Sequence, residues 1–351
     1  MTTPDAAIRT YRKGASISDK DALVLEDFKV YYGTPRGTVK AVDDVSFYIN
    51  HGETLGLVGE SGCGKTVTAL SILQLIRPPK GKIVSGQITY YYPDGRRVEI
   101  TSLKPNSKEM RKIRGNKISM IFQEPMTSLN PVFTIGNQIM EAITLHQNLD
   151  KKRAYVKTIE MLELVGIPSP EQRYNEYPHQ LSGGMRQRVM IAMALSCEPE
   201  VSIADEPTTA LDVTIQAQIL DLMKKIQKER TRSSILLITH DLSVIAETCH
   251  RVIVMYGGKI QEIAPVNLLF RKPLHPYTKG LLRSIPSVEN KGLRLKTIVG
   301  NVPSFQNFPK GCKFADRCPE VVDDCHTIEP NLKQIKSEQW VRCPLADESM
   351  K

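Results

Sequence analysis

The sequence predicts a mixed α/β fold in which a strand-rich core carries a helical subdomain and an irregular C-terminal extension. Three observations predict this fold class. Short apolar and β-branched runs alternate with helical patterns, and a complete G-x-x-x-x-G-K-T loop joins a predicted strand to a predicted helix. Prolines and cysteines then become frequent after residue 264. The 351 residues are enough for about two units of ordinary domain size.

The overall composition is that of a globular protein. Hydrophobic residues make up 41% of the chain and charged residues 24%, which excludes a disordered or fibrous protein. No run of about 18 apolar residues occurs, and residues 1–21 lack the apolar stretch of a signal peptide. We therefore expect a mobile N-terminal tail and a chain that stays in the cytosol. The net charge of +9 is spread along the sequence, so charge alone identifies no anionic partner.

Hydrophobic periodicity places the individual elements. Residues 23–30 and 41–49 read as a β-hairpin, and residues 54–58 as a strand that runs into a glycine-rich turn. Residues 67–75 then have helical spacing. Further strands are predicted at 88–92, 118–122, 201–204, 235–239 and 251–255, and a helical subdomain at about 135–196. The predicted domains are a tail (1–21), a core domain (22–264) and an extension with a cysteine cluster (265–351).

The strongest local signal is the glycine-rich loop that follows the predicted strand at 54–58. Its glycines let consecutive backbone N–H groups turn toward one anion, and the N-terminus of the next helix contributes its dipole. Lys65 adds positive charge at the outer phosphates of a nucleotide, and Thr66 is placed to bind Mg²⁺. The predicted nucleotide contacts in this loop are Gly59, Ser61, Gly62, Cys63, Gly64, Lys65 and Thr66.

A pair of acidic residues, Asp205 and Glu206, ends the predicted strand at 201–204. Taken alone, an acidic pair after a strand is more often a solvated edge. In a chain that also carries a phosphate-binding loop, the pair has a chemical role. Asp205 can then lie beside the Mg²⁺ ion of a nucleotide, while Glu206 can polarise the water that attacks the γ-phosphate.

A second anion-binding pattern lies at residues 181–188, just before a helical run. An anion at the N-terminus of this helix would meet the hydroxyl of Ser182 and the backbone N–H groups of Gly183 and Gly184. One nucleotide cannot easily use both this surface and the glycine-rich loop of the same chain. The sequence therefore predicts a head-to-tail dimer, in which each such loop closes over the nucleotide that the partner binds.

Together these motifs resemble the ordered motif set of ABC ATPases, and the match covers about residues 23–264. The resemblance implies a RecA-like core with an antiparallel β subdomain and an α-helical subdomain, and ATP held between two such units. The resemblance assigns Gln123 to Mg²⁺ contact and coupling to the membrane subunits, Glu206 to the catalytic base, His240 to γ-phosphate sensing, Asp212 to nucleotide contact and Tyr32 to adenine stacking. The alternative for Tyr32, and for its neighbour Tyr31, is that the ring only packs within its strand.

Three further segments resemble one ATPase subunit of oligopeptide and dipeptide importers. They are 181–195, where Met185 replaces a more usual glutamine, 122–132, and His275-Pro-Tyr-Thr278. The resemblance implies a second, similar ATPase subunit in a heterodimer, two transmembrane permease subunits and an extracytoplasmic solute-binding protein as partners. It places this chain peripherally on the cytoplasmic face of the membrane. Related importers carry nickel or oligosaccharides, so the cargo is left open.

Other classes of ATPase share this core. A DNA-repair or chromosome-organising ATPase would suit the basic charge, but the sequence has no sustained heptad run for a coiled-coil arm. Translation ATPases typically carry two cassettes, whereas this chain has one phosphate loop. A purely binding module is disfavoured because Glu206 and His240 are both retained. We therefore predict a transport ATPase that does not bind nucleic acid.

Four of the seven cysteines lie in the predicted extension: Cys312, Cys318, Cys325 and Cys343. Four such thiols can hold zinc, hold an iron–sulfur cluster or pack as small hydrophobes, and their spacing matches neither a zinc ribbon nor a ferredoxin run. The extension resembles that of peptide-importer ATPases that bind a four-iron cluster through four such cysteines. The resemblance therefore implies a structural [4Fe–4S] cluster as a cofactor beside ATP and Mg²⁺.

Overall fold

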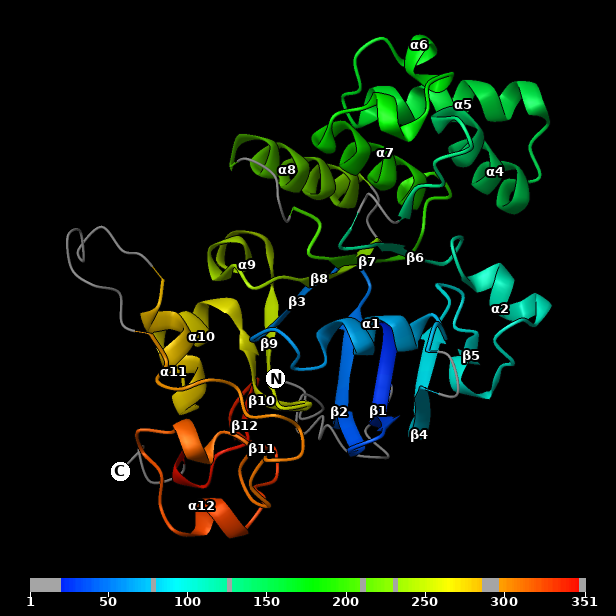
Figure 1. Cartoon of the computed structure of the whole chain (residues 1–351). Helices are drawn as coiled ribbons and strands as arrows, with labels where there is room; N and C mark the ends of the chain where they lie inside the picture. The colour runs from blue at the N-terminus through cyan, green and yellow to red at the C-terminus, as the bar shows by residue number, and fades with distance from the viewer. Residues whose placement is uncertain are drawn as a thin grey trace, which may run out of the picture. The chain divides into compact units, whose positions relative to one another are not determined.

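The computed structural model describes residues 20–76, 80–124, 128–208, 213–229, 233–285 and 297–346, which form two compact units (Figure 1). The first unit comprises the described parts of Met1–Ile49, Thr54–Thr101 and Thr239–Lys351. The second comprises those of Asn50–Glu53 and Ser102–Ile238. The glycine-rich loop and the C-terminal stretch thus belong to the same unit. Of the predicted tail, residues 1–19 lie outside the described residues.

The first unit contains an antiparallel sheet of order β2-β1-β4-β5. Alternate residues of β1, such as Leu23 and Leu25, are fully buried, as expected for a strand with one face on the core. The predicted hairpin is confirmed, and both strands are longer than predicted because they continue to the turn at Pro35 and Arg36. The elements are β1 (Asp21–Thr34), β2 (Gly37–Asn50), β4 (Gly81–Tyr91), β5 (Arg97–Glu99) and the 3₁₀ turn η2 (Ile100–Ser102).

A second run of strands in this unit has the order β11-β12-β10-β9-β3. The strands β3 and β9 are parallel, with Leu55 opposite Arg251 and Val58 opposite Val254. All five residues of β3 are buried, which agrees with its continuous apolar sequence. The elements are β3 (Thr54–Val58), α1 (Lys65–Ile72), α9 (Leu242–Thr248), β9 (Arg251–Tyr256), β10 (Lys259–Pro265), β11 (Lys333–Lys336) and β12 (Gln339–Val341).

The C-terminal stretch has more regular structure than the sequence predicts. Its hairpin β11–β12 extends the sheet, since Trp340 and Val341 pair with Ile263 and Glu262 of β10. Each element there is only a few residues long, too short to show a helical or strand period in the sequence. The helical pieces are α10 (Val266–Arg271), α11 (Pro276–Arg283), η5 (Ala315–Arg317) and α12 (Asp324–Thr327).

The second unit contains three parallel strands, ordered β6-β7-β8, and the predicted helical subdomain. Figure 1 shows α4, α5 and α7 of this subdomain grouped together. The side chains of Thr134, Asp150 and Ser182 cap α4, α5 and α7 by accepting hydrogen bonds from backbone N–H groups of the first turn. The elements are α2 (Lys108–Ile113), β6 (Ile118–Ile121), α4 (Ile135–Gln147), α5 (Lys151–Leu164), α6 (Pro170–Tyr174), η3 (Pro178–Gln180), α7 (Gly183–Leu195), β7 (Val201–Asp205), α8 (Val213–Glu229) and β8 (Ser234–Ile238).

A buried carboxylate, Glu262 on β10, ties three segments of the first unit together. Its Oε1 accepts hydrogen bonds from Leu274 N and from Gln339 Nε2, both at 2.9 Å, and its Oε2 accepts one from His275 N at 2.9 Å. Burial raises the pKa of Glu262, although these donors favour the charged form. The start of α11 and the strand β12 are therefore anchored on β10 by one side chain.

The substitution Glu262→Ala should lower the free energy of unfolding by about 2–4 kcal/mol, because three donors lose their acceptor in a buried setting. Glu262→Gln keeps a carbonyl oxygen and should lose less. Urea unfolding of both variants measures the difference, with Glu163→Ala on the exposed face of α5 as the control. Wild-type stability of Glu262→Ala would show that the network contributes nothing.

Candidate functional site

The loop motif at 59–66 connects β3 to α1 through residues 59–64, and its Lys65 and Thr66 begin the helix. At two points its backbone has a conformation that only glycine adopts readily. Gly59 and Gly64 have φ angles of 151° and 105°, in the region that L-amino acids avoid. A Cβ atom at Gly59 would lie 2.2 Å from the Met255 carbonyl oxygen, and one at Gly64 would lie 2.3 Å from the Ala41 carbonyl oxygen. Close packing against two neighbouring strands therefore fixes the course of the loop.

Lys65 lies inside this loop. Its side chain is buried, and its Nζ donates hydrogen bonds to the carbonyl oxygens of Gly59 at 2.7 Å and Glu60 at 3.2 Å. Gly64 precedes α1 without a side chain that could cap the first N–H groups of the helix. Ser61 and Thr66 are exposed. The arrangement combines a held ammonium group, a helix N-terminus without a side-chain cap and exposed hydroxyls, which suits a phosphate chain.

The two candidate tyrosines on β1 have different surroundings. The Tyr31 hydroxyl donates a hydrogen bond to Asp43 Oδ1 at 2.7 Å, so this side chain has a structural role. Tyr32 is half-buried beside Gly81, where a Cβ atom would lie 2.8 Å from the Tyr32 ring. The glycine leaves room for one edge of the ring, and the side chain is partly exposed. Of the two rings, Tyr32 is therefore the one that suits stacking on a base.

His240 follows β8 and is exposed. The preceding residue, Thr239, donates its backbone N–H to the Leu57 carbonyl oxygen at 3.4 Å, at the end of β3 from which the glycine-rich loop begins. The next residue, Asp241, caps α9 through a hydrogen bond from Ser243 N at 2.8 Å. His240 is thus held between two fixed neighbours, in the same compact unit as the loop.

In the second unit, the structure brings Gln123 and Glu206 together. The Gln123 Nε2 atom donates a hydrogen bond to Glu206 Oε2 at 3.1 Å, across 83 positions of sequence. Glu206 has a φ of 47°, a left-handed conformation that is uncommon and costly for a residue with a side chain. Its N–H donates to the Ile238 carbonyl oxygen at 2.8 Å, which holds that conformation. Asp205 is buried at the end of β7, directly before it.

The second anion-binding pattern opens α7, as predicted. The Ser182 Oγ atom accepts a hydrogen bond from Met185 N at 3.3 Å and so caps the helix. Ser182 and Gly183 are exposed, and a Cβ atom at Gly183 would meet no atom within 4 Å. The helix N-terminus is therefore open on this side of the unit. The predicted nucleotide contact Asp212 lies outside the described residues.

The structure adds two residues around the loop that the motifs do not indicate. The Glu60 N–H donates a hydrogen bond to the Tyr277 hydroxyl at 2.9 Å, and the Glu60 carboxylate forms an ion pair with Arg317 at 2.6 Å. These partners lie 217 and 257 positions from Glu60 in the sequence. The only sequence signal near them is the His275-Pro-Tyr segment, whose resemblance gave no role for the tyrosine.

The four C-terminal cysteines do not form the predicted metal site. Among the described residues, no three His, Cys, Asp or Glu side chains are arranged to hold a metal ion. Cys312 and Cys325 are joined through their backbones, with Cys312 N donating to Cys325 O at 2.7 Å, and none of the four is in a disulfide. Burial raises the pKa of the Cys312 thiol to about 12, and the nearby Cys325, Cys343 and Cys318 thiols raise it further. The prediction of a cluster is therefore not supported by the arrangement of the side chains.

Membrane-spanning elements were not predicted from the sequence. Within the described ranges, no helix combines the length and the hydropathy that crossing a bilayer requires.

Comparison with protein families gives two matches that together extend over most of the chain. The model of the ABC transporter family matches residues 42–209, and that of the oligopeptide/dipeptide transporter C-terminal region matches residues 261–325. The oligopeptide transport ATP-binding protein AppD of Bacillus subtilis is 53% identical over 326 residues, which are 93% of this chain and 97% of the relative. The dipeptide transport ATP-binding protein DppD of the same organism is 49% identical, over 93% and 95% of the two chains.

Two solved structures have a similar fold. One is a dimeric ATP-binding cassette in a post-hydrolysis state bound to ADP and Pi, with a TM-score of 0.61 and 26% identity. The other is a dimeric bacterial ABC transporter cassette, with a TM-score of 0.60 and 27% identity. Each similarity covers 70% of this chain and 98% of the solved chain.

The substitution Glu206→Gln should leave ATP binding intact and slow hydrolysis at this site by roughly two to four orders of magnitude, as expected when a general base is lost. Glutamine has the same shape and can keep a hydrogen bond to Gln123. Single-turnover hydrolysis, arranged so that only this site contributes, measures the rate. Glu163→Gln on α5 is the matched control, and wild-type turnover in Glu206→Gln would remove Glu206 from the mechanism.

Proposed function

The chain belongs to the ABC transporter family as an ATP-hydrolysing subunit of an oligopeptide or dipeptide importer, and on that premise we propose that its loop 59–66 binds the phosphates of ATP. The observation that carries the proposal is the loop itself. Its course is fixed by the close packing of Gly59 and Gly64, and it encloses the ammonium group of Lys65. Such a loop directs several N–H groups and one positive charge toward a bound anion.

The other predicted site residues take roles that suit their chemistry. Mg²⁺ prefers oxygen ligands, and the side chains that offer them are those of Thr66, Gln123 and Asp205. The ion would neutralise charge that develops on the phosphates. We assign Glu206 to positioning and deprotonating the attacking water, and its hydrogen bond to Gln123 supports this by orienting the carboxylate. His240 is assigned to γ-phosphate contact and Tyr32 to stacking on adenine.

We propose that two ATPase subunits act as a head-to-tail pair. The support is the open helix N-terminus at Ser182, which suits a phosphate that this chain does not itself bind, together with the dimeric state of both similar cassettes. ATP would then join the two subunits, because its γ-phosphate meets Lys65 of one subunit and the serine of the other. Hydrolysis and loss of phosphate would remove that link and let the pair open.

The partners follow from the same proposal. They are a second, similar ATPase chain, two permease subunits in the membrane and an extracytoplasmic solute-binding protein, with this chain peripheral on the cytoplasmic face. Two exposed apolar side chains support a protein partner near the segment that follows Gln123: Val132 is 71% exposed and Phe133 is 52% exposed. Movement of the ATPase pair would reach the permeases through this surface.

The isolated chain should therefore be a poor ATPase whose specific activity rises with concentration or on addition of the second ATPase subunit. Ser182→Arg should impair hydrolysis at the partner's site more than at its own, because the bulky cation displaces the phosphate contact that is supplied in trans. The measurement is single-site turnover in pairs that carry the substitution on one subunit. Full activity from a dilute sample, shown to be monomeric by light scattering, would contradict the paired site.

For the four C-terminal cysteines, we keep a structural [4Fe–4S] cluster as a proposal. The donor set suits it, because the thiols of Cys318, Cys325 and Cys343 lie near enough to Cys312 to raise its pKa, and Cys312 and Cys325 are joined by a backbone hydrogen bond. The arrangement of the side chains as they stand does not close around a metal ion. Cluster binding would therefore require a local movement of this segment, and no step of ATP hydrolysis depends on it.

Protein purified without oxygen should be brown and contain iron and acid-labile sulfide in about equal amounts, as a four-iron cluster requires. Cys→Ser at any of the four positions should lower the iron content and make the C-terminal segment more sensitive to protease. Cys249→Ser, outside the segment, is the matched control. Colourless protein with stoichiometric zinc, or with no metal, after anaerobic handling would contradict the cluster and leave the ATPase assignment unchanged.

A further inference from the structure

We propose that Arg317 and Tyr277 of the C-terminal region are positioning residues for ATP, which act by fixing Glu60 and with it the start of the phosphate-binding loop. The inference rests on the proposed role of loop 59–66 as the ATP-phosphate site. It gives the C-terminal region a direct part in nucleotide binding. All the residues concerned belong to the first compact unit.

The contact between Arg317 and Glu60 is a bidentate ion pair. Nη1 of Arg317 donates to Glu60 Oε2 at 2.6 Å, and Nη2 donates to Oε1 at 3.0 Å. The arginine side chain is only 5% exposed and the glutamate side chain 28% exposed, so water screens the pair weakly. A two-point pair of this kind fixes both the position and the orientation of the carboxylate.

Two further N–H groups of Arg317 are also in use. Nε donates to the Val299 carbonyl oxygen at 3.1 Å, and Nη1 donates to the Tyr256 hydroxyl at 3.2 Å. The guanidinium is therefore directed at protein groups on several sides and is held there. It acts on the nucleotide through Glu60 and is not placed as a direct phosphate ligand.

Tyr277 holds the backbone of the same residue. Its hydroxyl accepts the Glu60 N–H at 2.9 Å, and the side chain is fully buried. The His275 Nδ1 atom in turn accepts the Tyr277 N–H at 3.0 Å and caps α11. Burial lowers the pKa of His275 to about 3, so this cap is neutral in the physiological range. Through Glu262, the cap is anchored on β10, which gives Tyr277 a rigid support.

Aromatic packing joins the two partners of Glu60. The ring centroid of Tyr256, at the end of β9, lies 4.8 Å from that of Tyr277 and 5.3 Å from that of Phe314. Tyr277 and Phe314 are 5.2 Å apart. Phe314 precedes Arg317 by three positions, so the packing of these three rings fixes both Tyr277 and the segment that carries Arg317. The Glu60 contacts are therefore part of a packed body and not loose surface contacts.

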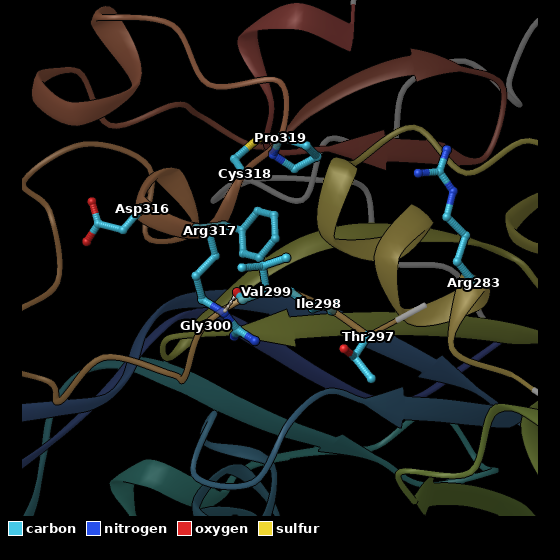
Figure 2. A pocket seen from close by; sticks show the side chains of 10 residues that line it. Arg283, Thr297, Ile298, Val299, Gly300, Asp316, Arg317, Cys318 and Pro319 are labelled. Atoms are coloured by element: carbon cyan, nitrogen blue, oxygen red, sulfur yellow. Dashed lines mark hydrogen bonds between the residues drawn. The ribbon is translucent and has the colours of Figure 1, made fainter. Parts of the chain in front are cut away.

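A cavity of about 580 Å³ lies beside Arg317, as Figure 2 shows. Its lining includes Val299, Gly300, Cys318 and, from α11, the exposed Arg283. If Arg317 is shortened, water can enter from this side, so the change removes the ion pair without leaving a sealed apolar void. Arg283 lines the same cavity without a contact to Glu60 and so provides a matched control.

The expected consequence concerns ATP affinity. A loop that is already held in its binding conformation loses little entropy when phosphate arrives, whereas a released loop must be ordered by the ligand. That cost falls equally on the bound substrate and on the transition state. Release of Glu60 should therefore raise the KM for ATP and leave kcat nearly unchanged. A role confined to folding would instead lower kcat through a smaller active fraction, at unchanged KM.

The experiment uses the assembled importer and measures KM, kcat and nucleotide Kd for Arg317→Ala, Tyr277→Phe and the control Arg283→Ala. Arg317→Ala should raise the KM for ATP about tenfold, and Tyr277→Phe about threefold, with kcat within about twofold of wild type. Arg317→Lys should recover little, since an ammonium cannot form the two-point pair. Arg283→Ala should behave as wild type. The double variant Glu60→Gln/Arg317→Met should have a KM for ATP no higher than that of Glu60→Gln or Arg317→Met alone. Each of these three variants loses the same contact between residues 60 and 317.

Two results would overturn the proposal: an unchanged KM in a folded Arg317→Ala complex, or an equal rise in the Arg283→Ala control. Lys65→Ala separates this failure from failure of the proposed ATP site. If Lys65→Ala abolishes nucleotide binding at this subunit's site while Arg317→Ala changes nothing, only the positioning role is wrong. If Lys65→Ala binds ATP normally, the assignment of the loop is itself wrong.

Discussion

The close approach of the Met255 carbonyl oxygen to Gly59 is the contact on which the first unit depends. A side chain at Gly59 would lie 2.2 Å from that oxygen, so the glycine is what allows β9 to pass directly beside the start of the loop. The parallel pairing of β3 with β9 sets this distance. From the turn after β9, Gly258 N–H then reaches back to the Cys63 carbonyl oxygen at 3.1 Å. The loop is therefore positioned by the sheet beneath it before any ligand binds.

Local motifs predicted the secondary structure around the candidate site, because the strand, loop and helix signals lie in adjacent residues. The glycines and Lys65 of the loop, the capped helix at Ser182 and the acidic pair ending in Glu206 all lie where the sequence predicts. The resemblance gave Gln123 and Glu206 separate roles, and the hydrogen bond between their side chains is a finding of the structure. The predictions failed where the relevant interactions join distant segments or where elements are short. Nothing in the local sequence connects Glu60 with a partner 257 positions away, and no periodicity reveals a hairpin as short as β11–β12.

Buried polar groups help to hold the C-terminal region to the rest of the first unit. Glu262, His275 and Gln339 have almost no exposed surface, and each takes part in hydrogen bonds that join β10, α11 and β12. Such hydrogen bonds add specificity, because a shifted arrangement would leave the buried donors without acceptors. An apolar contact would tolerate sliding by a fraction of a residue. The polar network fixes the register of the region, and so the position of the Tyr277 hydroxyl.

The long sequence separation of the Glu60 contacts has a consequence during synthesis of the chain. A ribosome makes Arg317 257 positions after Glu60, so the two side chains cannot meet until the C-terminal region has emerged. A chain that ends after β10 contains β3, α1 and β9 but lacks both partners that fix Glu60. A subunit whose C-terminal region is not yet made would therefore bind nucleotide less tightly than a finished subunit.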